Sequence, residues 1–190
     1  NVGVLAGAGN SDAFRFASGG SVASIDGAGG ANTLDYDAAN FNAAITANLT
    51  AAGSSVGFAG TATGIGTSFD NITAVIGDSG FNATNSLGSL NAANTWSVTG
   101  TDSGTYTSGT SLNFTNFGSL TGNANTDAFT LNGGTLSGSI DGGVGVNTLT
   151  AGNVANTWTI TTANGGSVAG EGGTFTNGQN LVGNAKRDAI

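Results

Sequence analysis

Internal repetition is the feature of this 190-residue chain that most constrains its fold. Residues 5–34 align without a gap with residues 120–149, at an offset of 115. The triplets Asp-Ala-Phe, Ile-Asp-Gly and Asn-Thr-Leu recur in the same order in both segments. Such spacing is typical of stacked repeats, in which each unit buries its apolar residues only against its neighbours.

A second motif, Phe-x-Asn-Ile/Phe-x-x-Leu-x-Gly or a close variant of it, occurs three times, at residues 69–77, 114–122 and 175–183. It divides the chain into predicted units at 1–68, 69–113, 114–174 and a truncated 175–190. In the short unit Asn94 stands twelve positions after Asn82, whereas in the next unit Asn156 stands twenty-nine positions after Asp127. The difference of seventeen predicts that the short unit lacks about one turn of the repeat.

The length of one turn follows from the local pattern. Asn32 stands twenty positions after Asp12, as Asn147 does after Asp127, and each of the four precedes a large apolar residue by two places. Several of these patterns continue with a second apolar residue two places on, which indicates strands, and Gly and Asn supply the corners between them. We therefore predict an all-β protein, a right-handed parallel β-helix with coils of about twenty residues.

Composition excludes several kinds of function. The chain contains no Cys or His, so it has no Ser-His or Cys-His nucleophile pair, no disulfide and no zinc site of the usual kind. A net charge of −8, with only Arg15, Lys186 and Arg187 as bases, argues against nucleic acid and anionic lipid as partners. The chain has no apolar run of the roughly 20 residues that span a bilayer, so no membrane insertion is expected.

Taken together, these motifs resemble the repeat regions of the large bacterial exoproteins related to filamentous haemagglutinin. The matching elements are the three Phe-x-Asn motifs, Asp-Ala-Phe, Ile-Asp-Gly-Gly-x-Gly and Asn-Thr-Leu. The resemblance implies export by two-partner secretion or as an autotransporter-like passenger. It also implies an extracellular place on the bacterial cell surface, as the stalk of a surface or biofilm-matrix adhesin.

A partial likeness to the calcium-binding nonapeptides of RTX proteins raises the question of metal binding. Residues 142–150 fit that pattern except that Asn147 replaces its Asp. The candidate calcium ligands are Asp12, Asp127, Asp141 and Asp188. Because Asn replaces Asp at equivalent positions and amides bind Ca²⁺ more weakly, we interpret Asp12, Asp127 and Asp188 as turn-forming residues. No cofactor is expected, with calcium as the alternative.

Two pairs of acids are candidates for catalysis. Asp26 and Asp141 occupy equivalent repeat positions in Ile-Asp-Gly and could form the carboxylate pair of a glycosidase. Their wide separation along the chain, by several coils, favours a turn role instead. Asp35 and Asp37, two apart on an expected strand, would share a solvated face. We therefore expect no catalytic residue and no enzyme.

The aromatic residues and threonines suggest two kinds of surface. Phe14, Trp96, Phe129 and Trp158 could stack on sugars, but their recurrence at one repeat position favours a stacked core. Tyr36 and Tyr106 have no repeat equivalents and are predicted to make exposed contacts. Thr-x-Thr pairs resemble those of ice-binding solenoids, but we expect no flat array because they do not recur on successive coils. They are Thr61/Thr63, Thr105/Thr107 and Thr157/Thr159.

Three functions remain open at this point. The first is a structural or adhesive stalk that contacts polysaccharide or a neighbouring cell surface. The second is a self-assembling extracellular fibre or surface-layer subunit, in which copies of the chain stack end to end. The third is a polysaccharide-active β-helix enzyme, which the small number of bases makes the weakest of the three.

Overall fold

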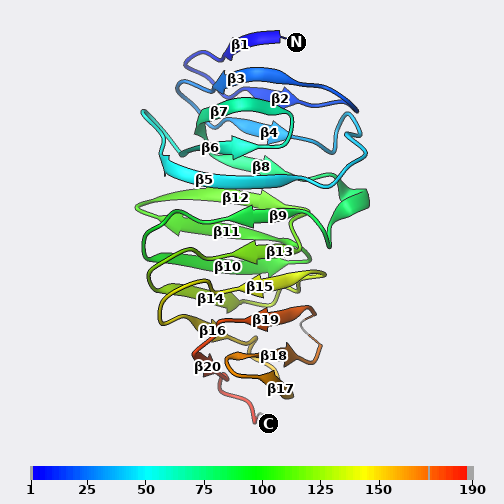
Figure 1. The fold of residues 1–190 in the computed structure, drawn as a ribbon, viewed down its shortest axis with the longest axis vertical. Coiled ribbons are helices and arrows are strands. Elements are labelled where there is room, and N and C mark those ends of the chain that lie inside the picture. Colours follow the sequence, from blue (N-terminus) through cyan, green and yellow to red (C-terminus); the bar gives the residue numbers. More distant parts are fainter. Residues whose placement is uncertain (1, 171, 188–190) are drawn as a thin grey trace.

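The computed structural model describes residues 2–170 and 172–187, and it confirms that the protein is all-β. Two large mixed sheets, neither of them closed, share one core of buried apolar residues (Figure 1). A single 3₁₀ turn, η1 (Ser79–Phe81), is the one helical element in the described residues. No helix in that part of the chain is long and apolar enough to cross a membrane.

The first sheet has eleven strands. In spatial order they are β1 (Val2–Ala6), β3 (Val22–Asp26), β7 (Ile65–Ile72), β6 (Phe58–Ala62), β5 (Thr46–Ala52), β9 (Ser86–Gly88), β13 (Ser119–Thr121), β15 (Ser139–Asp141), β19 (Thr174–Thr176), β18 (Gly165–Val168) and β17 (Trp158–Thr162).

The second sheet has nine strands. Their spatial order is β2 (Ala13–Arg15), β4 (Thr33–Asp35), β8 (Ala74–Ile76), β12 (Thr110–Thr115), β11 (Ser103–Ser108), β10 (Asn94–Gly100), β14 (Asp127–Leu131), β16 (Thr148–Thr150) and β20 (Asn180–Val182).

Single strands alternate between the two sheets along the chain, so that one strand from each sheet makes one level of the stack. Equivalent strands of successive levels pair in parallel, with Phe14 beside Leu34 and Phe129 beside Leu149. Both pairs are offset by twenty positions, the spacing that the sequence predicts. Short strands with one inward apolar residue suffice here because levels above and below cover each side chain.

Three antiparallel meanders interrupt this parallel pairing, and the sequence did not indicate them. They are β5–β7 and β17–β19 in the eleven-stranded sheet and β10–β12 in the nine-stranded sheet. In each meander the first strand lies three strand positions further along the stack than the last single strand of the same sheet. The second and third strands then pair antiparallel in the positions between, so that the third strand is parallel to that earlier single strand. The meanders therefore make both sheets mixed rather than purely parallel.

The Phe-x-Asn motif marks the end of every meander. Phe69, Phe114 and Phe175 are buried on the third strands, and the Asn two places on has a positive φ of 60°, 63° or 56°. That left-handed corner, which Asn tolerates better than most residues, turns the chain toward the opposite sheet. Because successive meanders lie in alternate sheets, the same motif works in both.

The turn missing from the short unit is a whole level. Two single strands, β8 and β9, separate the first and second meanders, whereas four, β13–β16, separate the second and third. The two spacings in the sequence differ by seventeen rather than by the twenty residues of one level, because η1 adds three residues to one corner of the short unit. Asn85, three places beyond Asn82, takes the corner role, and it precedes Asn94 by nine places, just as Asn147 precedes Asn156.

Candidate functional site: the corners and the outer faces

Buried amides hold the corners where the chain crosses between sheets. Asn32, Asn85 and Asn147 are at most 1% exposed. Their Nδ2 groups donate to the carbonyl oxygens of Asn71, Asn116 and Asn177, the positive-φ residues that end the three meanders, at 3.0, 2.7 and 3.2 Å. Each corner amide therefore ties a meander to the level before it.

Asp26 and Asp141 belong to these same junctions. Asp26 Oδ1 accepts from the Ala28 N–H at 2.8 Å and from Asn71 Nδ2 at 2.7 Å. Asp141 Oδ1 accepts from the Gly143 N–H at 2.9 Å and from Asn177 Nδ2 at 2.7 Å. The Asn71 amide, followed by the Ala28 N–H, lowers the pKa of Asp26. Both residues thus form Asx turns.

The two carboxylates cannot act as a catalytic pair. Asp26 ends β3, the second strand of its sheet, and Asp141 ends β15, the eighth. Six strand spacings separate them, about 29 Å, whereas paired glycosidase carboxylates stand within about 10 Å. Asp70 is the in-register neighbour of Asp26 instead, and its Oδ1 accepts from the N–H groups of Ser54 and Asn71.

Asp12 and Asp127 occupy the corner position of the amides. Asp12 Oδ2 accepts from the Ala8 N–H at 3.0 Å, and Asp127 Oδ1 accepts from Asn94 Nδ2 at 2.7 Å. Their own N–H groups donate to Oδ1 of Asn32 and Asn147, each one level further along the chain. Burial raises the pKa of Asp127, against the opposing effect of the Asn94 amide.

Within residues 2–170 and 172–187, no three acidic side chains gather closely enough to hold a metal ion. The fourth candidate, Asp188, lies outside the described residues.

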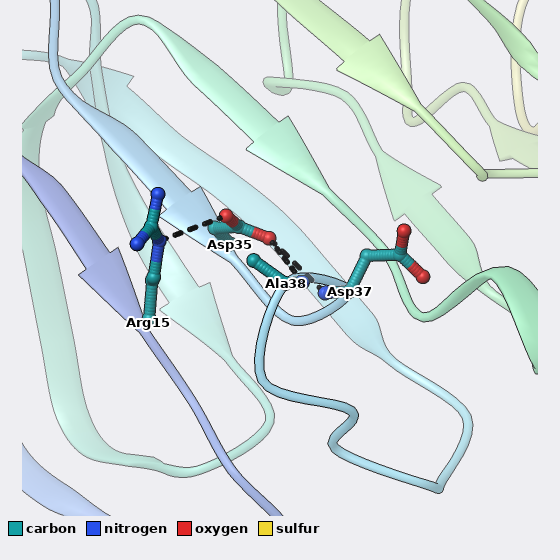
Figure 2. A network of polar contacts seen from close by, with 4 residues as sticks. All are labelled: Arg15, Asp35, Asp37 and Ala38. Atoms are coloured by element: carbon teal, nitrogen blue, oxygen red, sulfur yellow. Dashed lines mark hydrogen bonds and ion pairs between the residues drawn. The ribbon is translucent and has the colours of Figure 1, made fainter.

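The Asp35 and Asp37 pair differs from the sequence prediction. Strand β4 ends at Asp35, and Asp37 lies in the following turn, so the two side chains do not share a face (Figure 2). Asp35 is only 8% exposed; its Oδ1 accepts from the N–H groups of Asp37 and Ala38, and its Oδ2 lies 3.5 Å from Arg15 Nε. Asp37 accepts from the Ser79 N–H. Asp35 therefore ends the strand as a turn former.

The aromatic residues of the repeat positions lie in the core. Trp96, Phe129 and Trp158 are buried, and the rings of Trp96 and Phe129 are stacked 5.7 Å apart. Phe14 is half-buried against the same core, because it lies on β2, the first strand of its sheet. The three buried rings cannot form a sugar-stacking surface while they are covered.

The prediction of exposed contacts for Tyr36 and Tyr106 is wrong. Both side chains are 0% exposed. The Tyr36 hydroxyl donates to the Thr63 carbonyl at 2.7 Å, and the Tyr106 hydroxyl donates to Asn94 Oδ1 and accepts from the Leu90 N–H. Burial raises the pKa of both phenols. They lack repeat equivalents because Tyr106 lies on the middle strand of one meander and Tyr36 at a corner, not because they face solvent.

The hydroxyl-bearing residues form a regular array, contrary to the expectation from their spacing along the chain. On the outer face of the nine-stranded sheet, five adjacent strands align one polar residue each in a continuous row: Asn113, Thr105, Ser97, Thr130 and Thr150. A second row runs alongside it through Ser111, Thr107, Thr95, Ala128, Thr148 and Asn180.

The eleven-stranded sheet carries a similar outer row. It runs through Thr46, Ser86, Ser119, Ser139, Thr174, Ser167 and Thr159. The meanders bring these residues into register, although they are irregularly spaced in the sequence. Thr-x-Thr pairs that do not recur on successive coils in the sequence can therefore still belong to an ordered surface of hydroxyl groups.

Sequence reasoning also missed two buried acids, Asp78, which is 3% exposed, and Asp102. Asp102 is 1% exposed with a φ of 51°, and its carboxylate accepts from the N–H and the hydroxyl of Ser137 at 2.7 and 2.8 Å. It holds the turn between β10 and β11 against the next level. An isolated Asp in a non-repeating segment carries no signal that would identify such a role.

Comparison with known protein families, curated proteins and solved structures finds no match to this chain.

Proposed function

We propose that this chain is a structural and adhesive stalk segment of a secreted bacterial surface or biofilm-matrix adhesin. On this proposal the stack is a right-handed parallel β-helix into which antiparallel meanders are inserted. The observation that carries it is the arrangement of two open sheets around one core, in which levels repeat along a single axis. Such a stack extends by adding levels, and it projects whatever lies at its end.

The outer faces support an adhesive role. The two rows on the nine-stranded sheet present hydroxyl and amide groups without a charged side chain among them. Hydroxyl groups both donate and accept hydrogen bonds, which suits a neutral polysaccharide. The resemblance to exported exoproteins supports the same place of action, outside the cell.

Binding of the purified chain to immobilised neutral polysaccharides tests this role. Thr130→Lys, within one row, should weaken binding by placing a long charged side chain across the array. Val144→Lys places the same charged side chain at an exposed corner outside all of the hydroxyl rows and should leave binding intact. An unmodified chain that retains no polysaccharide, or equal losses in both variants, would contradict the proposed surface.

A self-assembling fibre is the second candidate, and exposed apolar residues at both ends of the stack favour it. Val4 on β1 is 71% exposed, and Val182 on β20 is 41% exposed. A fibre requires the two ends of the stack to fit each other, head to tail.

A further inference from the structure

The corner that contains η1 differs from the corners next to it on the same side of the stack. It spans residues 77–85, and its short coil stands out from the side of the sheets (Figure 1). The next crossing from the nine-stranded to the eleven-stranded sheet, at residues 116–118, is only three residues long, and the crossing after it, at 132–138, is long again. A short corner between two longer ones leaves a hollow in this side of the stack.

The hollow is a groove with a volume of about 570 Å³, within the range of about 300–1,000 Å³ that is usual for ligand sites. Residues 79–84 of the η1 corner form one wall, and Thr101, Asp102 and Ser137 complete the lining. The short corner carries Gly118 where these residues meet. A Cβ atom at Gly118 would lie 2.6 Å from Ser137 Oγ and 3.0 Å from Asp102 Oδ1, so glycine allows the three corners to close around the groove.

An aromatic ring in this groove has no role in the core. All ten Phe residues lie in the described part of the chain, and nine of them belong to the hydrophobic core or pack against it. The tenth, Phe81, is half-buried at the end of η1 and lines the groove instead. Ligand sites commonly combine aromatic rings with a few polar groups of fixed position.

Two hydroxyl groups of the groove are already oriented. Thr84 Oγ1 donates to the Phe81 carbonyl oxygen at 3.0 Å. Ser137 Oγ donates to Asp102 Oδ2 at 2.8 Å. Because both hydrogens are used within the protein, the lone pairs of the two hydroxyl oxygens remain to accept hydrogen bonds from a ligand. A ligand that carries several hydroxyl donors fits this arrangement.

Three carboxylates hold the residues of the groove and set its charge. Asp78, which is 3% exposed, accepts from the Gly80 N–H at 2.9 Å. Asp37 accepts from the Ser79 N–H at 2.8 Å, and Asp102 is itself part of the lining. Among the described residues that line the groove there is no Lys or Arg. An acidic ligand would therefore meet like charge without a compensating base, so the groove favours a neutral ligand.

We propose that this groove binds one segment of a neutral oligosaccharide. The ring of Phe81 would cover an apolar face of a sugar ring, and the oxygens of Thr84 and Ser137 would accept from sugar hydroxyl groups. Insertions into a repeat often form its binding face, and η1 is such an insertion. This inference rests on the proposed adhesive role, and it adds to the hydroxyl rows a discrete site at the side of the stack.

Calorimetry with soluble oligosaccharides tests the groove separately from the hydroxyl rows. The probes are neutral oligomers of glucose, mannose and N-acetylglucosamine, with oligomers of galacturonic acid as the acidic comparison. The unmodified chain should bind at least one neutral series and should bind the acidic series more weakly. Ala83→Lys, from an exposed position in the groove wall, should block the groove and abolish binding. Ala124→Lys, the same change at an exposed corner on the opposite side of the stack, should leave the affinity unchanged.

The ring itself is tested by a pair of variants. Phe81→Ala should weaken oligosaccharide binding by about tenfold, because it removes the stacking surface. Phe81→Trp retains an aromatic face and should keep the affinity close to that of the parent. Because Phe81 lies outside the core, both variants should melt near the parent temperature, which separates a loss of contact from a loss of folding.

Three outcomes would overturn the groove as a saccharide site. They are oligosaccharide binding that survives Ala83→Lys, an affinity of Phe81→Ala equal to that of the parent, and a chain that binds none of the neutral oligomers. In the last case, retention on immobilised polysaccharide that Thr130→Lys weakens would leave the adhesive role in place without the groove. A chain that binds saccharide in neither form would overturn both proposals.

Discussion

Removing one whole level tests whether the levels of the stack are interchangeable units. Deleting residues 128–147 joins Asp127 to Thr148 and removes β14 and β15, which leaves two single strands between the second and third meanders, as between the first and second. Strand β10 would then pair with β16, and β13 with β19. Leu149 would lie opposite Trp96 because both now pair with Phe129.

The expected loss of stability is small. A domain of this size unfolds with about 5–15 kcal/mol. Divided over the nine strands of the smaller sheet, this stability corresponds to about 0.6–1.7 kcal/mol per level if the levels contribute additively. The segment removed buries Phe129, Leu131, Leu136 and Ile140, but its removal also spares the entropy cost of ordering that segment. Urea unfolding should remain a single transition, with a slightly lower midpoint and a smaller m value.

A deletion longer by one residue is the control. Removing residues 128–148 brings Leu149 one position early, and the alternation of side chains along a strand then turns it outward. Exposure of a side chain that is 3% exposed in the parent should cost about 2–5 kcal/mol, as in Leu→Ala substitutions. Equal stability of the two deletions, or failure of the whole-level deletion to fold, would refute the stacked-level reasoning.

Three further predictions concern single residues and calcium. Trp96→Ala should lower the free energy of unfolding by about 3–5 kcal/mol, far more than Asp141→Asn, in denaturant melts; similar losses would mean that the core is misassigned. Asp127→Asn should leave the protein as stable or more stable at neutral pH, because burial raises the folded-state pKa of Asp127 and its ionisation opposes folding. The extra stability of Asp127→Asn over the parent should disappear as the pH falls below the unfolded-state pKa of about 3.9. If the extra stability instead grows in acid, the folded-state pKa of Asp127 is not raised. Melting temperatures in EDTA and in excess Ca²⁺ should agree, because Asp12 and Asp127 already bind N–H groups; a large rise with Ca²⁺ would establish a metal site.

Sequence periodicity predicted the elements of this fold that repeat. The spacing of Asp12 and Asn32 gives the offset between paired strands, because a corner residue must recur at each level. The repeated Trp96 and Phe129 lie in the core, because a stack leaves only inward positions for large rings. Equivalent positions carry this information because each level meets the same neighbours.

Positions without repeat equivalents were predicted poorly. Tyr36 and Tyr106 are buried, and Asp35 ends a strand rather than lining a solvated face. In each case the residue lies at a corner or within a meander, where the surroundings come from segments that are distant in the sequence. Local pattern carries no information about those neighbours.

The sequence by itself determined that the chain is all-β, how far apart along the chain its levels recur and which aromatic residues are central. Only the tertiary structure decided that three meanders double back within the sheets and that they alternate between them. It also decided that irregularly spaced threonines align into rows. The physical reason is that the period of a repeat follows from local corners and alternation, whereas the direction in which a strand adds to a sheet depends on which edge is free when the chain arrives.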